Sequence, residues 1–145
     1  MCPKKSWRNI QNKMEKETVV CIIKNRKGEV LLQKKTFDYK TAPGKWCLWG
    51  GEAESKNLNK EMRRELKEEL GMRLKPKFMF KKRINARENE KKEKAIFYVF
   101  LDKIDNLSKI KLNEGAGFAF FDKKELKNLN IASEIKIILN EYFKK

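Results

Sequence analysis

The stretch Arg64-Glu65-Leu66-Lys67-Glu68-Glu69-Leu70-Gly71-Met72 lies near the middle of this 145-residue chain and decides how the rest is interpreted. It closes the segment 57–70, in which apolar residues recur every four positions: Leu58, Met62, Leu66 and Leu70. This spacing predicts a helix with one apolar stripe. Asn57 is a suitable N-cap, and Gly71 suits the left-handed residue that follows a helix.

The same stretch predicts a cluster of carboxylates. Glu65, Glu68 and Glu69 stand at i, i+3 and i+4, on one helix face, and Glu61 lies one turn earlier beside that face. Like charges at this spacing repel, and a hard divalent cation such as Mg²⁺ or Mn²⁺, which prefers carboxylate oxygens, would remove the repulsion. A solvated Lys/Glu helix can also carry such a cluster without function, so the pattern alone leaves both interpretations open.

Outward from this helix, the order of patterns along the chain is roughly strands, helix, strands, helices. A β-branched apolar run, 18–24, and a second strand pattern, 29–35, with the apolar residues 30–32 at its centre, flank a turn that ends in glycine. Together they predict a hairpin. Gly50-Gly51 is predicted to break the chain after a short apolar run. Further strands are expected at 78–84, 95–102 and 118–121, and helices at 123–129 and 133–143. This order predicts an α+β fold rather than a doubly wound parallel sheet.

The domain organisation is predicted to be simple. Residues 1–17 form a basic arm or a short helix, with Trp7, Ile10 and Met14 at helical spacing, and residues 18–145 form a single domain. No apolar run approaches the length of a membrane span, and the start lacks the pattern of a secretory signal. We therefore expect no membrane association and a cytoplasmic location.

Composition excludes several kinds of chemistry. The chain has no histidine, which rules out Ser-His-Asp and Cys-His catalysis and His-ligated zinc. Three widely spaced cysteines indicate neither a disulfide framework nor a zinc site. The net charge of +16 would attract polyanionic partners, but a general lysine bias is the favoured explanation of this charge.

Three motifs together resemble one family. Residues 64–72 match in full the second half of the Nudix box, R-E-U-x-E-E-x-G-U, where U is aliphatic. Residues 46–51 resemble the W-x-[LF]-x-G-G approach to that box, and residues 114–121 resemble a downstream E-G-x-x-x-x-F-F segment. Over roughly 18–143 the chain resembles MutT-like Nudix hydrolases, which implies an α/β/α sandwich with a mixed β-sheet.

The first half of the box departs from the family pattern G-x5-E-x7-R. Counting back from Arg64 places Gly50 at the box glycine and Lys56 at the box glutamate. Counting forward from the Gly-Gly pair places Gly51 and Asn57 there instead, with a loop one residue shorter. Either way the glutamate that helps to organise the site in the family is missing, which makes the first half degenerate. Two acids in this loop could substitute: Glu52 and Glu54.

The resemblance implies metal-dependent hydrolysis of a pyrophosphate linkage in a nucleoside diphosphate derivative, with Mg²⁺ as cofactor and Mn²⁺ as an alternative. Glu65 or Glu68 would also take the proton from water, and Arg64 would brace the loop or a carboxylate. The implied metal ligands are Glu65, Glu68, Glu69, the Gly50 carbonyl and Glu114. The residues expected beside the substrate are Gly50, Gly51 and Trp46, with Phe37 and Tyr39 as further candidates for stacking on a base. Aromatic residues at such positions more often serve packing, so that alternative stays open for all three.

Two functions remain as hypotheses. The favoured one is a pyrophosphohydrolase that acts on a small nucleotide such as a nucleoside triphosphate. The alternative is a non-catalytic protein that binds a nucleotide or RNA on a degenerate Nudix scaffold, for which the missing box glutamate and the basic charge argue. RNA is the less favoured partner. The resemblance allows a homodimer, but no interface is identifiable in the sequence.

Overall fold

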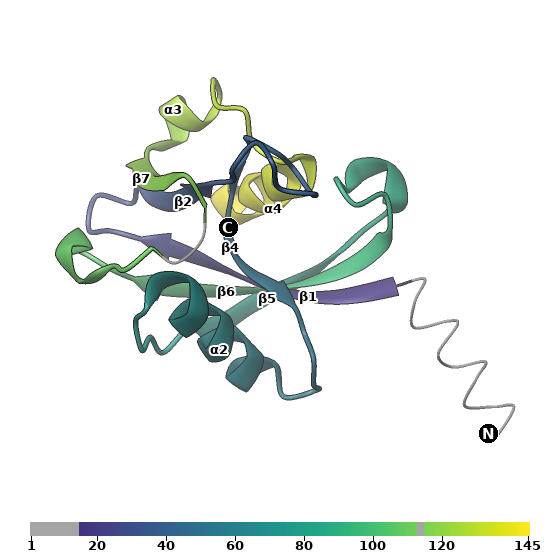
Figure 1. The fold of residues 1–145 in the computed structure, drawn as a ribbon, viewed down its shortest axis with the longest axis horizontal. Coiled ribbons are helices and arrows are strands. Elements are labelled where there is room, and N and C mark those ends of the chain that lie inside the picture. Colours follow the sequence, from purple (N-terminus) through teal and green to yellow (C-terminus); the bar gives the residue numbers. More distant parts are fainter. Residues whose placement is uncertain (1–14, 113–114) are drawn as a thin grey trace, which may run out of the picture.

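A mixed β-sheet forms the centre of the fold, and helices lie on both sides of it (Figure 1). The computed structural model describes residues 15–112 and 115–145, so residues 1–14 of the predicted arm lie outside the described part. The strands are β1 (Glu15–Lys24), β2 (Val30–Lys34), β3 (Trp46–Cys47), β4 (Trp49–Glu52), β5 (Lys77–Ile84), β6 (Lys94–Lys103) and β7 (Gly117–Phe121). The helices are α2 (Leu58–Leu70), α3 (Lys123–Leu126) and α4 (Ser133–Lys144), with 3₁₀ turns η1 (Ala86–Glu88) and η2 (Leu107–Lys109). The predicted α+β fold with a mixed sheet is confirmed.

Strand β1 is the central element of the sheet. It pairs in parallel with β6 along its whole length, from Glu15 opposite Lys94 to Lys24 opposite Lys103. On its other edge it pairs antiparallel with β4. The ladder with β6 explains why β1 begins at Glu15, three residues before the predicted start, because each added residue gains a partner on β6.

Two local predictions differ from the structure. The predicted hairpin of the first two strands is reduced to a single paired position, Lys24 opposite Val30, after which β2 pairs with β3 and β7 instead. The Gly50-Gly51 pair does not break the chain but lies inside β4, opposite Val20 and Val19. Both differences have one cause: β4 occupies the edge of β1 that a long hairpin would need.

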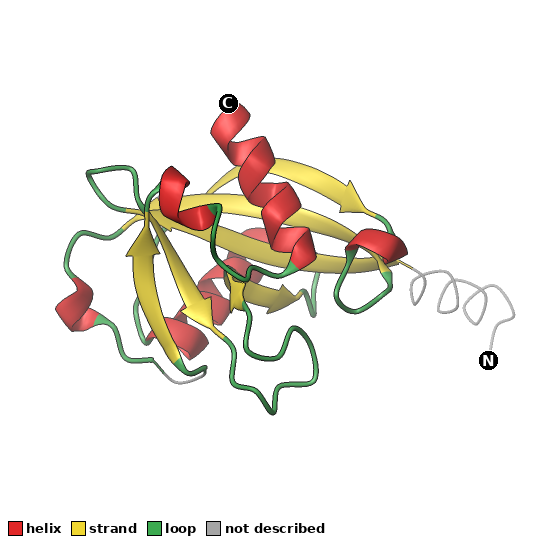
Figure 2. Cartoon of the chain, turned by 90° about the horizontal axis from the view of Figure 1, so that it is seen from above, coloured by secondary structure: helices red, strands yellow, loops and turns green. Residues whose placement is uncertain are grey.

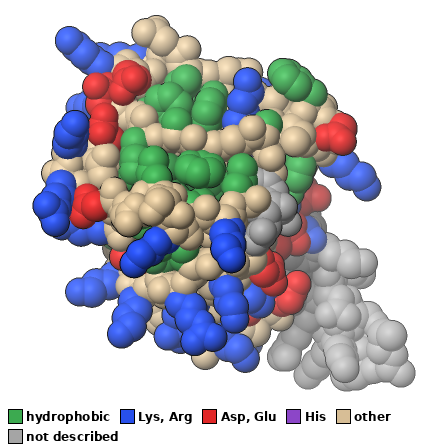
Figure 3. Space-filling model, turned by 60° about the vertical axis from the view of Figure 1, so that its left-hand side comes forward, with side chains coloured by type: hydrophobic (Ala, Val, Ile, Leu, Met, Phe, Trp, Pro, Cys, Tyr) green, Lys and Arg blue, Asp and Glu red, His purple; other side chains and the backbone are tan. Residues whose placement is uncertain are grey.

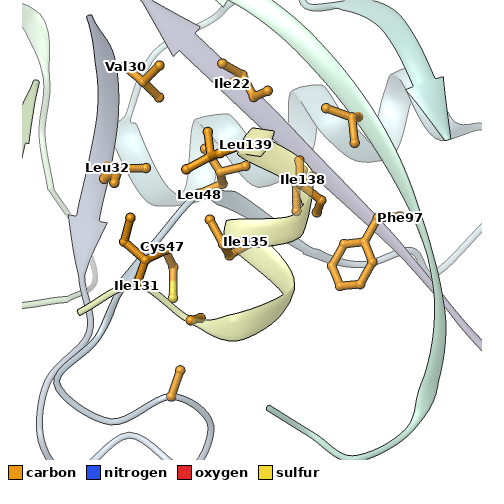
Figure 4. Close-up of a cluster of buried hydrophobic side chains, with 14 of the residues drawn as sticks. Ile22, Val30, Leu32, Cys47, Leu48, Phe97, Ile131, Ile135, Ile138 and Leu139 are labelled. Carbon is orange, nitrogen blue, oxygen red and sulfur yellow. The ribbon is translucent and has the colours of Figure 1, made fainter. Parts of the chain in front are cut away.

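Side chains of β1 alternate between two buried clusters, as expected for a strand buried on both faces. Val20 and Ile22 belong to the cluster on the α4 side, where Ile135, Ile138 and Leu139 cover the sheet (Figure 4). Val19, Cys21 and Ile23 belong to the cluster on the α2 side. Figure 2 shows α4 lying across the strands.

The remaining helices and strands mostly match the predicted ranges. Helix α3 ends at Leu126, three residues before the predicted end, whereas the later strands shift by one residue at most at either end. None of the helices in the two described ranges is long and apolar enough to cross a membrane.

Candidate active site

Helix α2 is held firmly against the sheet, which fixes the position of its acidic side chains. The Asn57 side chain accepts a hydrogen bond from the Lys60 backbone N–H at 3.2 Å, and Gly71 ends the helix with a φ of +66°. Met62, Leu66 and Leu70 of the apolar stripe are fully buried. The glutamates therefore lie along the margin of the buried face, as the sequence predicted.

Arg64 gathers three of these glutamates around its guanidinium group. Its Nη2 donates to Glu61 Oε1 and to Glu65 Oε1, each at 3.1 Å, and its Nη1 donates to Glu68 Oε1 at 3.0 Å. The hydrogen bond to Glu61 is the main reason why the pKa of Arg64 is raised. The pKa of Glu61 is lowered, first by the backbone N–H of Glu54 and then by Arg64. The group thus keeps opposite charges in contact.

Glu69 faces β4 instead. Both of its carboxylate oxygens lie 3.1 Å from the Gly50 backbone nitrogen, which donates to them. The Nε2 of Gln33 donates to Glu69 Oε2 at 3.4 Å and to the Leu48 carbonyl at 3.1 Å. Glu69 and Gln33 are both buried, so these bonds compensate for the loss of water. They fasten the carboxyl end of α2 to the glycine-containing strand.

Glu65 lies against the second glycine of β4. A Cβ atom added to Gly51 would stand 2.9 Å from Glu65 Oε1, which is closer than van der Waals contact allows. Only glycine at this position leaves room for the carboxylate. The fold therefore brings the side chains of Glu65 and Glu69 to Gly50-Gly51; their joint role as one site stays a prediction.

The donor set suits Mg²⁺ or Mn²⁺, since it consists of carboxylates beside strand backbone and contains no sulfur or imidazole. The Gly51 position also leaves space beside the Glu65 carboxylate that a Cβ would fill. Among the described residues, however, no three acidic or thiol side chains are arranged to hold a metal together. Arg64 holds three of the carboxylates, and the Gly50 backbone N–H holds that of Glu69. Metal binding would therefore require the carboxylates to turn away from these donors.

A pocket of about 300 Å³ lies on the α4 side of the sheet and also reaches the two glycines of β4. Its walls combine apolar side chains with a few polar ones, which is typical of ligand pockets. The apolar walls include Val20, Leu48, Ala95, Phe97 and Ile135; the polar lining includes Lys16, Lys35, Tyr39, Asn89, Lys91 and Glu134.

Two polar residues of this pocket were missed by the sequence analysis. Asn89 and Glu134 are both buried, and they come from the β5–β6 connection and from α4. Glu134 Oε2 accepts the backbone N–H of Glu90 at 3.0 Å, which joins these two segments. No motif marked either residue, because only the folded chain brings them together.

The other predicted site residues are placed as follows. Tyr39 lines the pocket, whereas Trp46 does not and packs edge-on against Phe121 with ring centroids 4.9 Å apart. Phe37 is 81% exposed and lies beneath the Lys34 ammonium group. Glu114 lies outside the described residues, so its predicted role as a ligand stays a prediction.

Cys47, in the pocket wall, is expected to react slowly with thiol reagents. Burial is the main reason why its pKa rises from an ordinary value of 9.0 to about 12; Lys35 opposes the rise and Glu134 reinforces it. Since the thiolate reacts, iodoacetamide at pH 8 should label Cys47 in a Cys2→Ser/Cys21→Ser variant at least about 100-fold more slowly than free cysteine. The rate should rise about tenfold per pH unit up to about pH 11; a plateau near pH 9 would contradict this.

The fold and the site together define a class of protein: an α+β domain in which an acidic helix meets a glycine-containing strand beside a pocket of about 300 Å³. Comparisons with known proteins agree. The NUDIX domain profile matches residues 14–142. The chain therefore belongs to the Nudix family and is a Nudix-type pyrophosphohydrolase.

Relatives and solved structures support this assignment. The nucleoside triphosphatase NudI of Escherichia coli is 31% identical over 109 residues, which cover 70% of this chain and 77% of that protein. The NudI of Klebsiella pneumoniae is 39% identical over a shorter stretch that covers 42% of this chain and 44% of that protein. The MutT protein of Methanosarcina mazei Go1 superposes with a TM-score of 0.72 at 25% identity, over 92% of this chain and 98% of that one.

Some of the structural neighbours carry ligands. A bifunctional NMN adenylyltransferase/ADP ribose pyrophosphatase from Francisella tularensis, complexed with AMP and a manganese ion, superposes with a TM-score of 0.72. It is 16% identical, and the match covers 97% of this chain and 44% of that one. At this identity, the likeness concerns the fold.

Proposed function

We propose that this protein hydrolyses a pyrophosphate linkage in a nucleoside triphosphate or a similar small nucleotide, with Mg²⁺ as cofactor and Mn²⁺ as a substitute. One observation carries the proposal: the acidic helix and the pocket share the same two glycines of β4. Gly50 donates to Glu69, a Cβ on Gly51 would collide with Glu65, and both glycines line the pocket. A nucleoside in the pocket would extend its phosphates toward the carboxylates.

The residues have complementary tasks in this reaction. Glu65, Glu68 and Glu69 would hold the metal, which when bound neutralises phosphate charge and lowers the pKa of water. Glu68, whose side chain is 55% exposed, is the carboxylate best placed to meet solvent and accept the proton of the attacking water. The water oxygen bonds to phosphorus, the bridging P–O bond breaks, and the leaving group departs with the remaining phosphate.

Lysines around the pocket suit a polyanionic substrate. Lys16, Lys35 and Lys91 line it, against two lining glutamates, Glu93 and Glu134. The name of the NudI relatives, nucleoside triphosphatase, supports nucleoside triphosphates as the first class to test.

The test is a phosphate-release assay over nucleoside triphosphates, dinucleoside polyphosphates and ADP-ribose, with Mg²⁺, with Mn²⁺ and with EDTA. A parallel series containing inorganic pyrophosphatase distinguishes pyrophosphate from phosphate as the product. We expect turnover of at least one nucleotide that EDTA abolishes and either metal restores. Turnover that persists undiminished in EDTA would contradict the metal-dependent reaction.

A binding protein without catalysis is the second candidate, favoured by the missing box glutamate and by the charge of +16. Figure 3 shows lysine and arginine side chains crowded along the lower part of one face. This candidate predicts that nucleotides or RNA bind to the protein while no nucleotide in the assay is hydrolysed. RNA affinity would then fall steeply with added salt.

A further inference from the structure

Glu61 occupies a position that neither the box pattern nor the pocket singles out. We propose that Glu61 takes over from the missing box glutamate as a positioning residue: it anchors Arg64 and the loop after β4, and thereby orients Glu65 and Glu68. The proposal rests on the proposed function for its consequence in catalysis. The anchoring of Arg64 and of the loop by Glu61 does not depend on the proposed function, because it concerns contacts between residues of this chain.

The first argument is burial. Glu61 is 4% exposed, a rare environment for a carboxylate unless it is paired. Its Oε1 accepts the backbone N–H of Glu54 at 2.5 Å and the Nη2 of Arg64 at 3.1 Å. One buried oxygen therefore joins the loop to the arginine that holds the site's carboxylates.

The second argument is that the nearby alternatives do other things. Glu52 is exposed and bonds to Lys91 at 3.1 Å, away from Arg64. The Glu54 side chain is 78% exposed and stays 3.9 Å from Arg64, although its backbone N–H bonds to Glu61. Of the two candidate box positions, Asn57 caps α2 and Lys56 is exposed. Neither acid that the sequence offered as a substitute fills the role.

The third argument concerns what Arg64 would do without this anchor. Its Nη2 is shared between Glu61 and Glu65, and its Nε is already buried without a partner. Without the charge of Glu61, the guanidinium group depends mainly on Glu65 and Glu68, because the Glu54 carboxylate is exposed and stays 3.9 Å away. Those two carboxylates would then be less available to a metal, since they must turn away from Arg64 to bind one.

The test compares Glu61→Gln with wild type and with Glu54→Gln as the matched control. Glutamine keeps the size of the side chain and an acceptor for the Glu54 N–H, but removes the charge that holds Arg64. We expect the affinity for Mn²⁺, measured by electron paramagnetic resonance, to fall about tenfold or more in Glu61→Gln, as for other residues that orient metal ligands. Glu54→Gln, with an exposed side chain, should stay within twofold.

Two further measurements separate positioning from a general structural effect. In Glu61→Gln, the Mg²⁺ concentration for half-maximal turnover should rise while the KM for nucleotide stays within twofold, because the pocket is untouched. In Glu61→Ala, which also removes the acceptor, the amide of residue 54 should exchange hydrogen at least about tenfold faster. That measurement needs neither metal nor substrate.

An Mn²⁺ affinity within twofold of wild type in a folded Glu61→Gln variant overturns the proposal. If that variant does not fold, Glu61→Asp, which keeps the charge but shortens the side chain, replaces it: weakened Mn²⁺ binding supports the proposal and unchanged binding overturns it. If the wild-type protein binds Mn²⁺ but hydrolyses no nucleotide, the proposed function fails, while the affinity comparison still decides the role of Glu61.

Discussion

Replacing Gly50 with alanine should lower the free energy of unfolding by about 3 kcal/mol or more, enough to unfold much of a marginally stable domain. Gly50 has a φ of +148°, and a Cβ added to it would lie 1.9 Å from the Val19 carbonyl oxygen and 2.8 Å from the Val20 Cα. These are backbone atoms of β1, the central strand, so they cannot move aside as a flexible side chain could. The strand pair, and with it the Glu69 contact, would have to separate.

Urea unfolding followed by the fluorescence of the fully buried Trp49 measures this loss. Gly28→Ala is the matched control, because Gly28 also has a positive φ, +81°, but has nothing within 4 Å of an added Cβ. It should cost only about 1 kcal/mol. If both variants lost the same free energy of unfolding, the close approach of β4 to β1 would not be the reason why Gly50 must be glycine.

A contrasting outcome is expected for Gly51→Ala. There the added Cβ meets the end of the Glu65 side chain, which can rotate, rather than backbone. Folding should therefore survive with a loss below about 1 kcal/mol, while Mn²⁺ affinity falls because the carboxylate is displaced. Of these two neighbouring glycines, Gly50 is thus expected to determine stability and Gly51 the position of a site carboxylate. A Gly51→Ala variant that unfolds, or that keeps the full Mn²⁺ affinity, would contradict this expectation.

Helix α2 could be predicted almost to the residue because its determinants are local. Four apolar residues at four-residue spacing, an N-cap at Asn57 and a glycine at position 71 each act within one or two turns. The acids on its margin could be placed for the same reason. What the sequence could not show is which of them is buried, since Glu61 loses its water only when the loop after β4 closes over it.

Non-local contacts account for the features that the sequence did not predict. The local sequence around Gly50-Gly51 is typical of the end of a strand, but pairing with β1 keeps these two residues inside β4. The first two strands have hairpin patterns, yet β4 takes the edge of β1 that they would share. The pocket combines residues such as Asn89 and Glu134, 45 positions apart, whose proximity depends on the placement of α4 against the sheet.

Glu68→Gln should reduce metal-dependent turnover about 100-fold or more, while leaving the fold intact. The carboxylate of Glu68 is expected both to ligate the metal and to accept a proton, and a contribution of this size is typical of general acid–base groups. Its loss should cost little stability, because the side chain is 55% exposed and its pairing with Arg64 is an i, i+4 surface ion pair worth about 0.3–0.5 kcal/mol. A large loss of activity with a small loss of stability is what separates a site residue from a packing residue.

The assay is nucleotide turnover at saturating Mg²⁺, paired with urea unfolding of the same preparations. Glu141→Gln serves as the control, because Glu141 is also a partly exposed glutamate on a helix, with its carboxylate 4.0 Å from the Lys82 ammonium group. It lies on α4, away from the acidic margin of α2. It should keep turnover within twofold. If Glu68→Gln also kept full turnover, the acidic margin of α2 would be a solvated surface after all, and the match of residues 64–72 to the box would not describe this protein's catalytic machinery.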